Sequence, residues 1–396
     1  MSRILCAWEL GGGYGHIAAL APLAQALRAR GHEVLLVLKD LFYAERILGS
    51  AGLAYMQAPV WQHPPRDLPE PVNYAEILCH VGYLNATNLL GLVKAWRQLY
   101  RAVRPELLLV DHAPTALLAA RGLDIRTVTY GSGFFAPPRS VPMPNFRPWV
   151  QIPAERLVNS EARVLHEINQ VLNTLGESSL DCLADLLAVD HEFLATFPEL
   201  DHYGERSNAD YCGPRFTRDT GAAPHWPEGT GPRVFAYLKP GFRDFPAIIA
   251  ALRALPCRAL IHAPGLGVEE RARLSGPQLQ FSEQPVHMGC VAAQCDLGIC
   301  HAGHGTVAAM LLAGRPLLVV PMQPEQALVA RRVEALGAGR AVYPDQAPPD
   351  YAQCVTTLLA DASLRAAATA FAKRHADFDE ARQFARVTAC CEALLS

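Results

Sequence analysis

Short apolar segments alternate with amphipathic segments along this chain, and the alternation constrains its fold more than any other feature. The first apolar segment, RILCAWEL, is followed by the glycine-rich turn GGGYGH, the periodic run IAALAPLAQALRARG and a second apolar segment, HEVLLVLKD. A strand, a helix and a strand in this order predict a βαβ unit. We therefore expect an α/β fold whose parallel sheet carries helices on both faces.

The alternation occurs in two blocks, which predict two domains. PELLLVDH and RTVTYGSG are further strands of the first block, and VFAYLKP, CRALIHAPG, LQFSEQ, CDLGICHAG and RPLLVVPM form the second. Between the blocks, residues 211–233 are rich in glycine and proline and lack apolar periodicity, which is typical of a linker. Residues 136–153 are proline-rich and read as a loop, whereas residues 155–190 read as helical.

These segments set the expected domain boundaries. We expect an N-terminal domain over residues 1–214, a linker over 215–232, a C-terminal domain over 233–375 and a last helix over 376–396 that crosses back to the N-terminal domain. A doubly wound α/β domain binds its ligands outside the carboxyl ends of its strands. The residues that follow those strands are therefore the first candidates for a site.

Composition agrees with a globular protein and excludes some functions. The chain has 396 residues, of which 51% are hydrophobic and 18% charged, and its formal net charge is −3 without a basic stripe. Such a charge distribution argues against nucleic-acid binding. With no basic leader and no run of 18 apolar residues, neither a signal peptide nor a membrane span is expected, and peripheral membrane contact stays open. The 11 scattered cysteines indicate reduced thiols of a cytoplasmic protein.

The junction after CDLGIC has the properties of an anion-binding turn. HAGHG follows the predicted strand, and TVAAMLLAG continues as a helix. Glycines let a ligand approach the backbone closely, and the free N–H groups of a helix start favour an anion. Thr306 can cap this helix or donate to a phosphate oxygen, and His301 adds a donor. The turn fits a diphosphate without a metal; a plain tight turn is the alternative.

This stretch resembles the donor-binding signature of family 1 glycosyltransferases, the GT-B enzymes that include the macrolide, glycopeptide and plant UDP-sugar transferases. The matching residues are His301, Gly303, Gly305, Thr306, Gly314, Pro316, Pro321, Glu325 and Gln326, followed by ARRVEALGAG. GGGYGHIAALAPLAQALRARGHEV and ADYCGP resemble two more motifs of the family, so the resemblance extends over the whole chain. It implies the GT-B fold, in which two doubly wound Rossmann-like domains face each other across a cleft.

The resemblance also implies roles in donor binding. His301 and the turn from Gly303 to Thr306 would hold the diphosphate, with the large polar side chain of His304 beside it and Gly305 before the threonine. Glu325 and Gln326 would bind sugar hydroxyls, since a carboxylate beside an amide offers both acceptors and donors. A solvated helix start is the alternative for that pair. Val286 falls where the family presents backbone groups to the nucleotide base.

No metal or cofactor is expected beside the nucleotide sugar, which is a co-substrate. The histidines at positions 262, 287, 301 and 304 do not have the spacing of a zinc site. GT-B transferases stabilise the leaving diphosphate with a helix dipole and protein donors.

His16 and Asp111 are the candidate catalytic residues. His16 ends the first glycine-rich turn, and an imidazole that titrates near neutrality suits removal of a proton from an acceptor hydroxyl. A carboxylate would orient it, and Asp111 lies at the carboxyl end of a predicted strand, where the family uses an aspartate. His112 complicates this assignment, because it either points away along the strand or competes with His16.

Ala309 is the most informative departure from the family. UDP-sugar enzymes commonly carry a glutamate eight residues after the motif histidine, where it binds both ribose hydroxyls, and here that position is Ala309. An alanine cannot reach a 2′-hydroxyl. The substitution therefore favours a dTDP-sugar, or a site with little selection, over strict use of a UDP-sugar.

The resulting hypothesis is an inverting, metal-independent glycosyltransferase of natural product or glycolipid biosynthesis. It would move a sugar from a dTDP- or UDP-sugar to a hydroxyl of a small lipophilic acceptor, which the N-terminal domain would bind. Two alternatives remain: a catalytically silent partner that binds a nucleotide sugar, and a GT-B nucleotide-sugar epimerase. The sequence leaves the acceptor, the sugar and the oligomeric state open.

Overall fold

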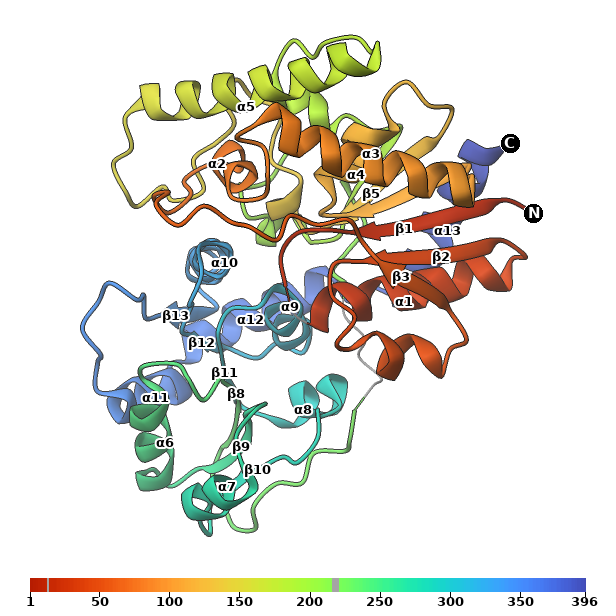
Figure 1. Cartoon of the computed structure of the whole chain (residues 1–396). Helices are drawn as coiled ribbons and strands as arrows, with labels where there is room; N and C mark the ends of the chain where they lie inside the picture. Colours follow the sequence, from red (N-terminus) through yellow and green to blue (C-terminus); the bar gives the residue numbers. More distant parts are fainter. Residues whose placement is uncertain (13, 216–220) are drawn as a thin grey trace. The chain divides into compact units, whose positions relative to one another are not determined.

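The chain folds into two compact units in a computed structural model that describes residues 1–12, 14–215 and 221–396 (Figure 1). Unit 1 comprises residues 1–197, 206–215 and 379–396, and unit 2 comprises residues 198–205 and 216–378. The sequence did not indicate that residues 198–205 join the second unit. The expected linker, 215–232, includes residues 216–220, which lie outside the described residues, as does residue 13 of the glycine-rich turn.

Unit 1 is built on a sheet of seven parallel strands in the order β3-β2-β1-β4-β5-β6-β7. The strands are β1 (Arg3–Trp8), β2 (Glu33–Leu38), β3 (Ala54–Gln57), β4 (Leu107–Asp111), β5 (Arg126–Gly131), β6 (His191–Leu194) and β7 (Asp210–Tyr211). All five residues of β4, LLLVD, are buried. An almost continuous apolar run is typical of a strand that is covered on both faces.

Helices cover both faces of this sheet, because successive side chains of each strand point to opposite sides. Leu5, Ala7 and Leu108 pack in one apolar cluster, whereas Ile4 and Cys6 pack in the other. The first face carries α2 (Tyr74–Cys79), α3 (Ala86–Val103), α4 (Pro114–Ala120) and α5 (Ala154–Leu175). The second carries α1 (Tyr14–Ala29) and α13 (Glu380–Leu395), and Figure 1 shows α1 and α3 on opposite sides of β1.

One predicted helix is shorter than expected. The segment 155–190 was expected to be helical throughout, but α5 ends at Leu175 because Gly176 takes a left-handed backbone with φ of 75°. Glycine adopts this conformation without a steric cost and commonly ends helices. A short 3-10 turn, Leu183–Leu187, then leads into β6.

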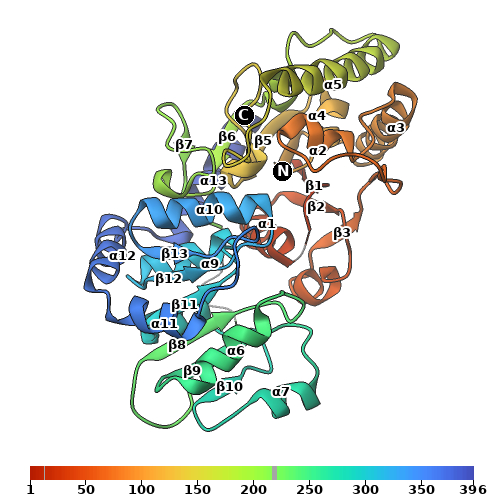
Figure 2. The same cartoon turned by 90° about the vertical axis from the view of Figure 1, so that its left-hand side faces the viewer.

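Unit 2 has a second parallel sheet, with six strands in the order β10-β9-β8-β11-β12-β13. Figure 2 labels the strands in this order across the sheet. The strands are β8 (Arg233–Tyr237), β9 (Arg258–His262), β10 (Leu279–Phe281), β11 (Leu297–Cys300), β12 (Leu317–Val319) and β13 (Gly339–Ala341). The helices are α6 (Phe245–Ala254), α7 (Val268–Leu274), α8 (Met288–Gln294), α9 (His304–Leu312), α10 (Pro324–Ala335), α11 (Tyr351–Ala360) and α12 (Ala362–Arg374). The predicted α/β class with two doubly wound domains is confirmed.

The strand order of each sheet reverses once, and the reversals lie between β1 and β4 in unit 1 and between β8 and β11 in unit 2. Ligands of doubly wound folds bind at these switch points, outside the carboxyl ends of the strands. His16 lies in the helix that follows β1, and Asp111 is the last residue of β4. The turn from His301 to Thr306 follows β11. His16, Asp111 and the turn from His301 to Thr306 therefore lie at switch points, whereas Val286, Glu325 and Gln326 follow other strands of unit 2.

Two further properties of the chain bear on its chemistry. All 11 cysteines are free thiols. None of the helices in the described part of the chain has the length and apolar character required to cross a membrane.

The packing of α13 against unit 1 can be tested at Val387, which is fully buried in the cluster that also contains residues of α1 and β1. Replacing Val387 by alanine should lower the free energy of unfolding by about 2 kcal/mol, because a cavity remains. Val158→Ala on α5 is the control: Val158 is 50% exposed, and surface changes usually stay within about 0.5 kcal/mol. Equal losses in urea denaturation would contradict the packing of α13.

Candidate functional site

His16 and Asp111 form a hydrogen-bonded pair at the switch point of unit 1. The distance from His16 Nδ1 to Asp111 Oδ2 is 2.8 Å, and both side chains are buried. Because an ionised carboxylate can only accept, Nδ1 carries the proton and donates it to Asp111. The tautomer thus fixed leaves the Nε2 lone pair of His16 available to a substrate proton.

Asp111 has a second partner, Arg215. From the sequence, Arg215 was expected in the linker. Its guanidinium lies 2.7 Å from Asp111 Oδ2, and it also donates to the carbonyl of Tyr130 at 2.9 Å. Burial by itself would raise the pKa of the Asp111 carboxyl, but the charge of Arg215 and the interaction with His16 outweigh that effect and hold the pKa well below its usual range. Asp111 is therefore ionised at neutral pH.

Aromatic rings fix the plane of the His16 imidazole. The Trp8 ring is stacked on it, with centroids 4.8 Å apart and an interplanar angle of 15°. Phe135, in the 3-10 turn Gly133–Phe135, lies on it at a centroid distance of 5.3 Å. Gly11 is required beside this ring, because its φ is +82° and a Cβ there would lie 2.7 Å from His16 Nε2. The absent side chain keeps the basic nitrogen uncovered.

His112 takes neither of the two courses that the sequence left open. It does not bind Asp111, whose Oδ2 faces His16 and Arg215. It also does not point away, because its ring is stacked on Phe135 at 4.2 Å, so the two imidazoles contact the same phenyl ring.

The turn at the switch point of unit 2 presents free backbone donors. Helix α9 begins at His304 after the N-cap Gly303, which has no side chain to cap it. The first N–H groups of a helix lack partners within the helix, and together with the helix dipole they attract anions. Thr306, which is partly exposed, lies in this first turn. The turn therefore suits an anion, and binding of the donor diphosphate here stays a prediction.

His301 uses both ring nitrogens to hold this turn. Nδ1 donates to the carbonyl of Val320 at 2.9 Å, so Nε2 is the acceptor that receives the backbone N–H of Lys239 at 2.8 Å. Burial lowers the pKa of His301, and the charge of Lys239 acts in the same direction. The neutral ring therefore fixes the turn against the end of β8. Its contact with a diphosphate stays a prediction.

Glu325 and Gln326 lie in the first turn of α10, as the resemblance implies. Gln326 Oε1 accepts the N–H of Met322 at 2.8 Å, which orients the amide. Glu325 Oε1 lies 3.8 Å from Nε2 of His202, a fully buried residue that the sequence did not single out. The His202 ring is stacked on that of His304 at 5.7 Å. His202 thus contacts both the turn and the sugar-binding candidate.

Val286 lies in a short parallel bridge with Ala222. Ala222 donates to Pro285 and accepts from His287. In such a bridge the N–H and C=O of the central residue face away from the bridging strand. Binding of a nucleotide base by these two groups stays a prediction.

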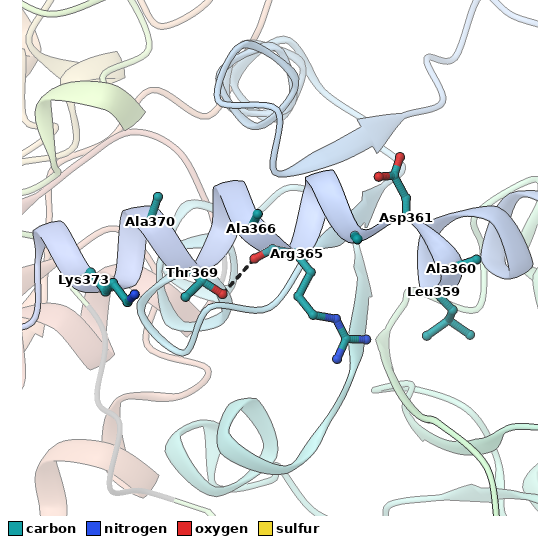
Figure 3. A pocket seen from close by; sticks show the side chains of 9 residues that line it. Leu359, Ala360, Asp361, Arg365, Ala366, Thr369, Ala370 and Lys373 are labelled. Atoms are coloured by element: carbon teal, nitrogen blue, oxygen red, sulfur yellow. Dashed lines mark hydrogen bonds between the residues drawn. The ribbon is translucent and has the colours of Figure 1, made fainter.

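A hollow on unit 2 does not coincide with these residues. It has a volume of about 540 Å³, follows α12 and is lined by Leu359, Ala360, Asp361, Ala362, Arg365, Ala366, Thr369, Ala370 and Lys373 (Figure 3). None of these is a candidate from the sequence. In the described ranges, no group of three histidine, cysteine or acidic side chains could hold a metal ion.

Parts of the chain are similar in sequence to known proteins. Residues 284–379 match the family described as the erythromycin biosynthesis protein CIII-like C-terminal domain. Over 55 residues the chain is 42% identical to the NDP-glycosyltransferase YjiC of Bacillus licheniformis, a match that spans 14% of the length of each protein.

Solved structures match over the full length. Spinosyn rhamnosyltransferase SpnG has a TM-score of 0.67 at 22% identity and covers 100% of this chain and 99% of its own. The glycosyltransferase SnogD from Streptomyces nogalater has a TM-score of 0.64 at 21% identity, over 98% and 99% of the two chains. The fold is that of the GT-B glycosyltransferases. The resemblance that the sequence showed is confirmed.

The role of Arg215 can be tested by replacing it with methionine. The free energy of unfolding should fall by about 3 kcal/mol at neutral pH, because a buried carboxylate loses a partner. A carboxyl whose pKa is lowered on folding stabilises the protein above its unfolded pKa, about 3.9, and loses this stabilisation as the pH falls. The difference between wild type and variant should therefore shrink below about pH 4. Urea denaturation across this pH range measures it.

Arg126→Met is the matched control for that experiment. Arg126 is 56% exposed and lies 3.4 Å from Asp190 in an exposed ion pair, which should contribute no more than about 1 kcal/mol. If Arg215→Met costs no more than this control, Arg215 does not compensate the charge of Asp111.

Proposed function

We propose that this chain is an inverting glycosyltransferase that transfers a sugar from a nucleoside diphosphate donor to a hydroxyl of a small lipophilic acceptor. The observation that carries the proposal is the buried pair of His16 and Asp111, joined at 2.8 Å at the switch point of unit 1. The anion-binding turn at the switch point of unit 2 supports it. The catalytically silent partner and the epimerase remain alternatives that activity measurements decide.

In this reaction His16 acts as the general base. Its Nε2 takes the proton of the acceptor hydroxyl while the acceptor oxygen attacks the anomeric carbon from the side opposite the diphosphate. The bond between that carbon and the diphosphate oxygen breaks in the same displacement, so the configuration is inverted. Asp111 stabilises the imidazolium that forms and keeps the ring in its productive tautomer.

The leaving diphosphate gains negative charge as the bond breaks, and unit 2 supplies the donors that would stabilise it. These are the N–H groups at the start of α9 and the hydroxyl of Thr306, which favour an anion without a metal ion. Glu325 and Gln326 would bind the hydroxyls of the sugar, and the backbone groups of Val286 would bind the base.

A thymidine nucleotide is the donor that we favour. Ala309 is buried in α9 where UDP-sugar enzymes carry a ribose-binding glutamate, so no carboxylate is left unpaired when the 2′-hydroxyl is absent. The rhamnosyltransferase SpnG has been solved with thymidine diphosphate and with spinosyn aglycone. Thymidine diphosphate is the nucleotide part of the donor proposed here, and an aglycone is an acceptor of a glycosyltransferase.

The proposed base is tested by His16→Ala. Turnover should fall by about 10²- to 10⁴-fold, the usual contribution of a general base, whereas the affinity for dTDP should not change because the base contacts only the acceptor. Asp111→Asn should have a smaller effect of the same kind. His166→Ala, a change of an exposed histidine on α5, is the control and should keep full activity. A fully active His16→Ala protein would exclude this base.

The nucleotide preference is tested by competition between dTDP and UDP on the purified protein. Wild type should bind dTDP at least as well as UDP, and the thymine methyl adds about 0.8 kcal/mol if it meets apolar surface. Ala309→Glu should move the preference toward UDP. Wild-type protein that prefers UDP tenfold would show that another residue reads the ribose.

A further inference from the structure

His112 is a buried polar side chain without a hydrogen-bonding partner. Only 6% of the residue is exposed, and within the described part of the chain neither Nδ1 nor Nε2 makes a hydrogen bond. Leaving a buried polar group unsatisfied costs about 1–3 kcal/mol. Native proteins keep few such groups, and each calls for an explanation.

The backbone of His112 is left-handed, with φ of 49°. Residues other than glycine pay a steric cost there, although histidine is among those that adopt this conformation most often. The carbonyl of His112 accepts the N–H groups of Glu9 and Leu10, at 3.3 and 2.9 Å, which compensates part of this cost. The side chain is thereby turned from the end of β4 toward the ring of Phe135.

This position is next to the proposed base. A Cβ on Gly11 would lie 2.7 Å from His16 Nε2 and 3.7 Å from His112 Nδ1. The distance between the two nitrogens therefore cannot exceed the sum of these two distances. An oxygen bound to each nitrogen could belong to neighbouring atoms of one molecule. The side chain that would fill this place is absent, because residue 11 is glycine.

The imidazole of His112 is kept neutral. Burial lowers its pKa to about 3, and the nearby charge of His16 acts in the same direction. A neutral ring both donates and accepts a hydrogen bond, so it can bind a hydroxyl or a carbonyl without a countercharge. The adjacent strand end carries Ser132, whose buried hydroxyl also has no partner among the described residues.

We propose that His112 is a specificity-determining residue that binds a second oxygen of the acceptor, on the carbon next to the one that carries the reacting hydroxyl. This inference rests on the proposed function and names its substrate class: acceptors with two vicinal oxygens. The second oxygen forms a hydrogen bond with an unsatisfied nitrogen of His112, while the first hydroxyl gives its proton to His16. An acceptor that lacks the second oxygen leaves that nitrogen unsatisfied and is transferred more slowly.

The experiment compares two acceptors that differ by one hydroxyl, 4-methylcatechol and 4-methylphenol, with the dTDP-sugar that stabilises the wild-type protein most. Wild type should prefer 4-methylcatechol by about 10- to 100-fold in kcat/KM, as one hydrogen bond in a buried site allows. His112→Phe, which keeps the ring but removes both nitrogens, should abolish the preference. His112→Asn, which keeps a hydrogen-bonding group and tolerates the left-handed backbone, should retain part of it.

The ratio between the two acceptors reports on His112, whereas transfer to either of them reports on the proposed function. A wild-type ratio near one, or a His112→Phe variant that keeps the wild-type ratio, overturns the inference even if the protein is an active transferase. Affinity for dTDP should be the same in wild type and both variants.

A stability measurement tests the inference without any acceptor. His262→Phe is the matched control, because Nδ1 of His262 lies 2.9 Å from Ser282 Oγ and the variant loses that hydrogen bond. His112→Phe loses none and should reduce the free energy of unfolding less than His262→Phe does. Phenylalanine suits the left-handed backbone less well than histidine or asparagine, so His112→Asn is measured beside it. A loss larger than that of His262→Phe in both variants would show that the nitrogens of His112 are satisfied within the protein, and the inference fails.

Discussion

Asp111 places a charge where water does not reach, and the arrangement of unit 1 at its switch point follows from the compensation of that charge. The carboxylate is fully buried and meets His16 from the start of α1 and Arg215 from the segment that leaves the unit. An unpaired carboxylate in such a place costs several kcal/mol. Two segments that lie about one hundred residues before and after Asp111 in the sequence are therefore held at the end of β4 by this carboxylate.

The two units share the same local backbone geometry after one strand at the switch point, but the following helix start differs between them. In each, the second strand at the switch point is followed by a non-glycine residue with left-handed backbone, His112 at 49° and Ala302 at 57°. A helix begins within two residues of it, α4 in unit 1 and α9 in unit 2. Strained backbone of this kind tends to persist where function requires it.

What differs is whether a side chain accepts from the N–H groups at the helix start. In unit 1 the carboxylate of Glu9 accepts from the N–H groups of Thr115 and Ala116, at 2.8 and 3.4 Å, so the donors at the start of α4 are already used. In unit 2 no side chain caps α9. The start of α4 therefore has its donors occupied, whereas the proposed site for the donor diphosphate is the uncapped start of α9.

The sequence was sufficient for the features that local patterns encode. Alternation of apolar and amphipathic segments predicted both sheets, and the glycine-rich turn and the strand end predicted that His16 and Asp111 would meet. Arg215 was missed because it follows the Gly-Pro pair of a stretch that reads as a linker. His202 was missed because residues 198–205 are flanked on both sides by segments of the other unit, and no periodicity marks such an exchange.

The path of the chain has a consequence for how this protein can be divided. The chain passes between the units four times, and α13 from residues 379–396 covers the same face of the first sheet as α1. No single cut yields two intact halves, because a fragment that stops before α13 leaves an apolar surface of α1 exposed to aggregation. During synthesis the N-terminal unit therefore waits for a helix that emerges after the whole of the other unit. If domains are exchanged between relatives, residues 206–215 and 379–396 must be transferred together with residues 1–197.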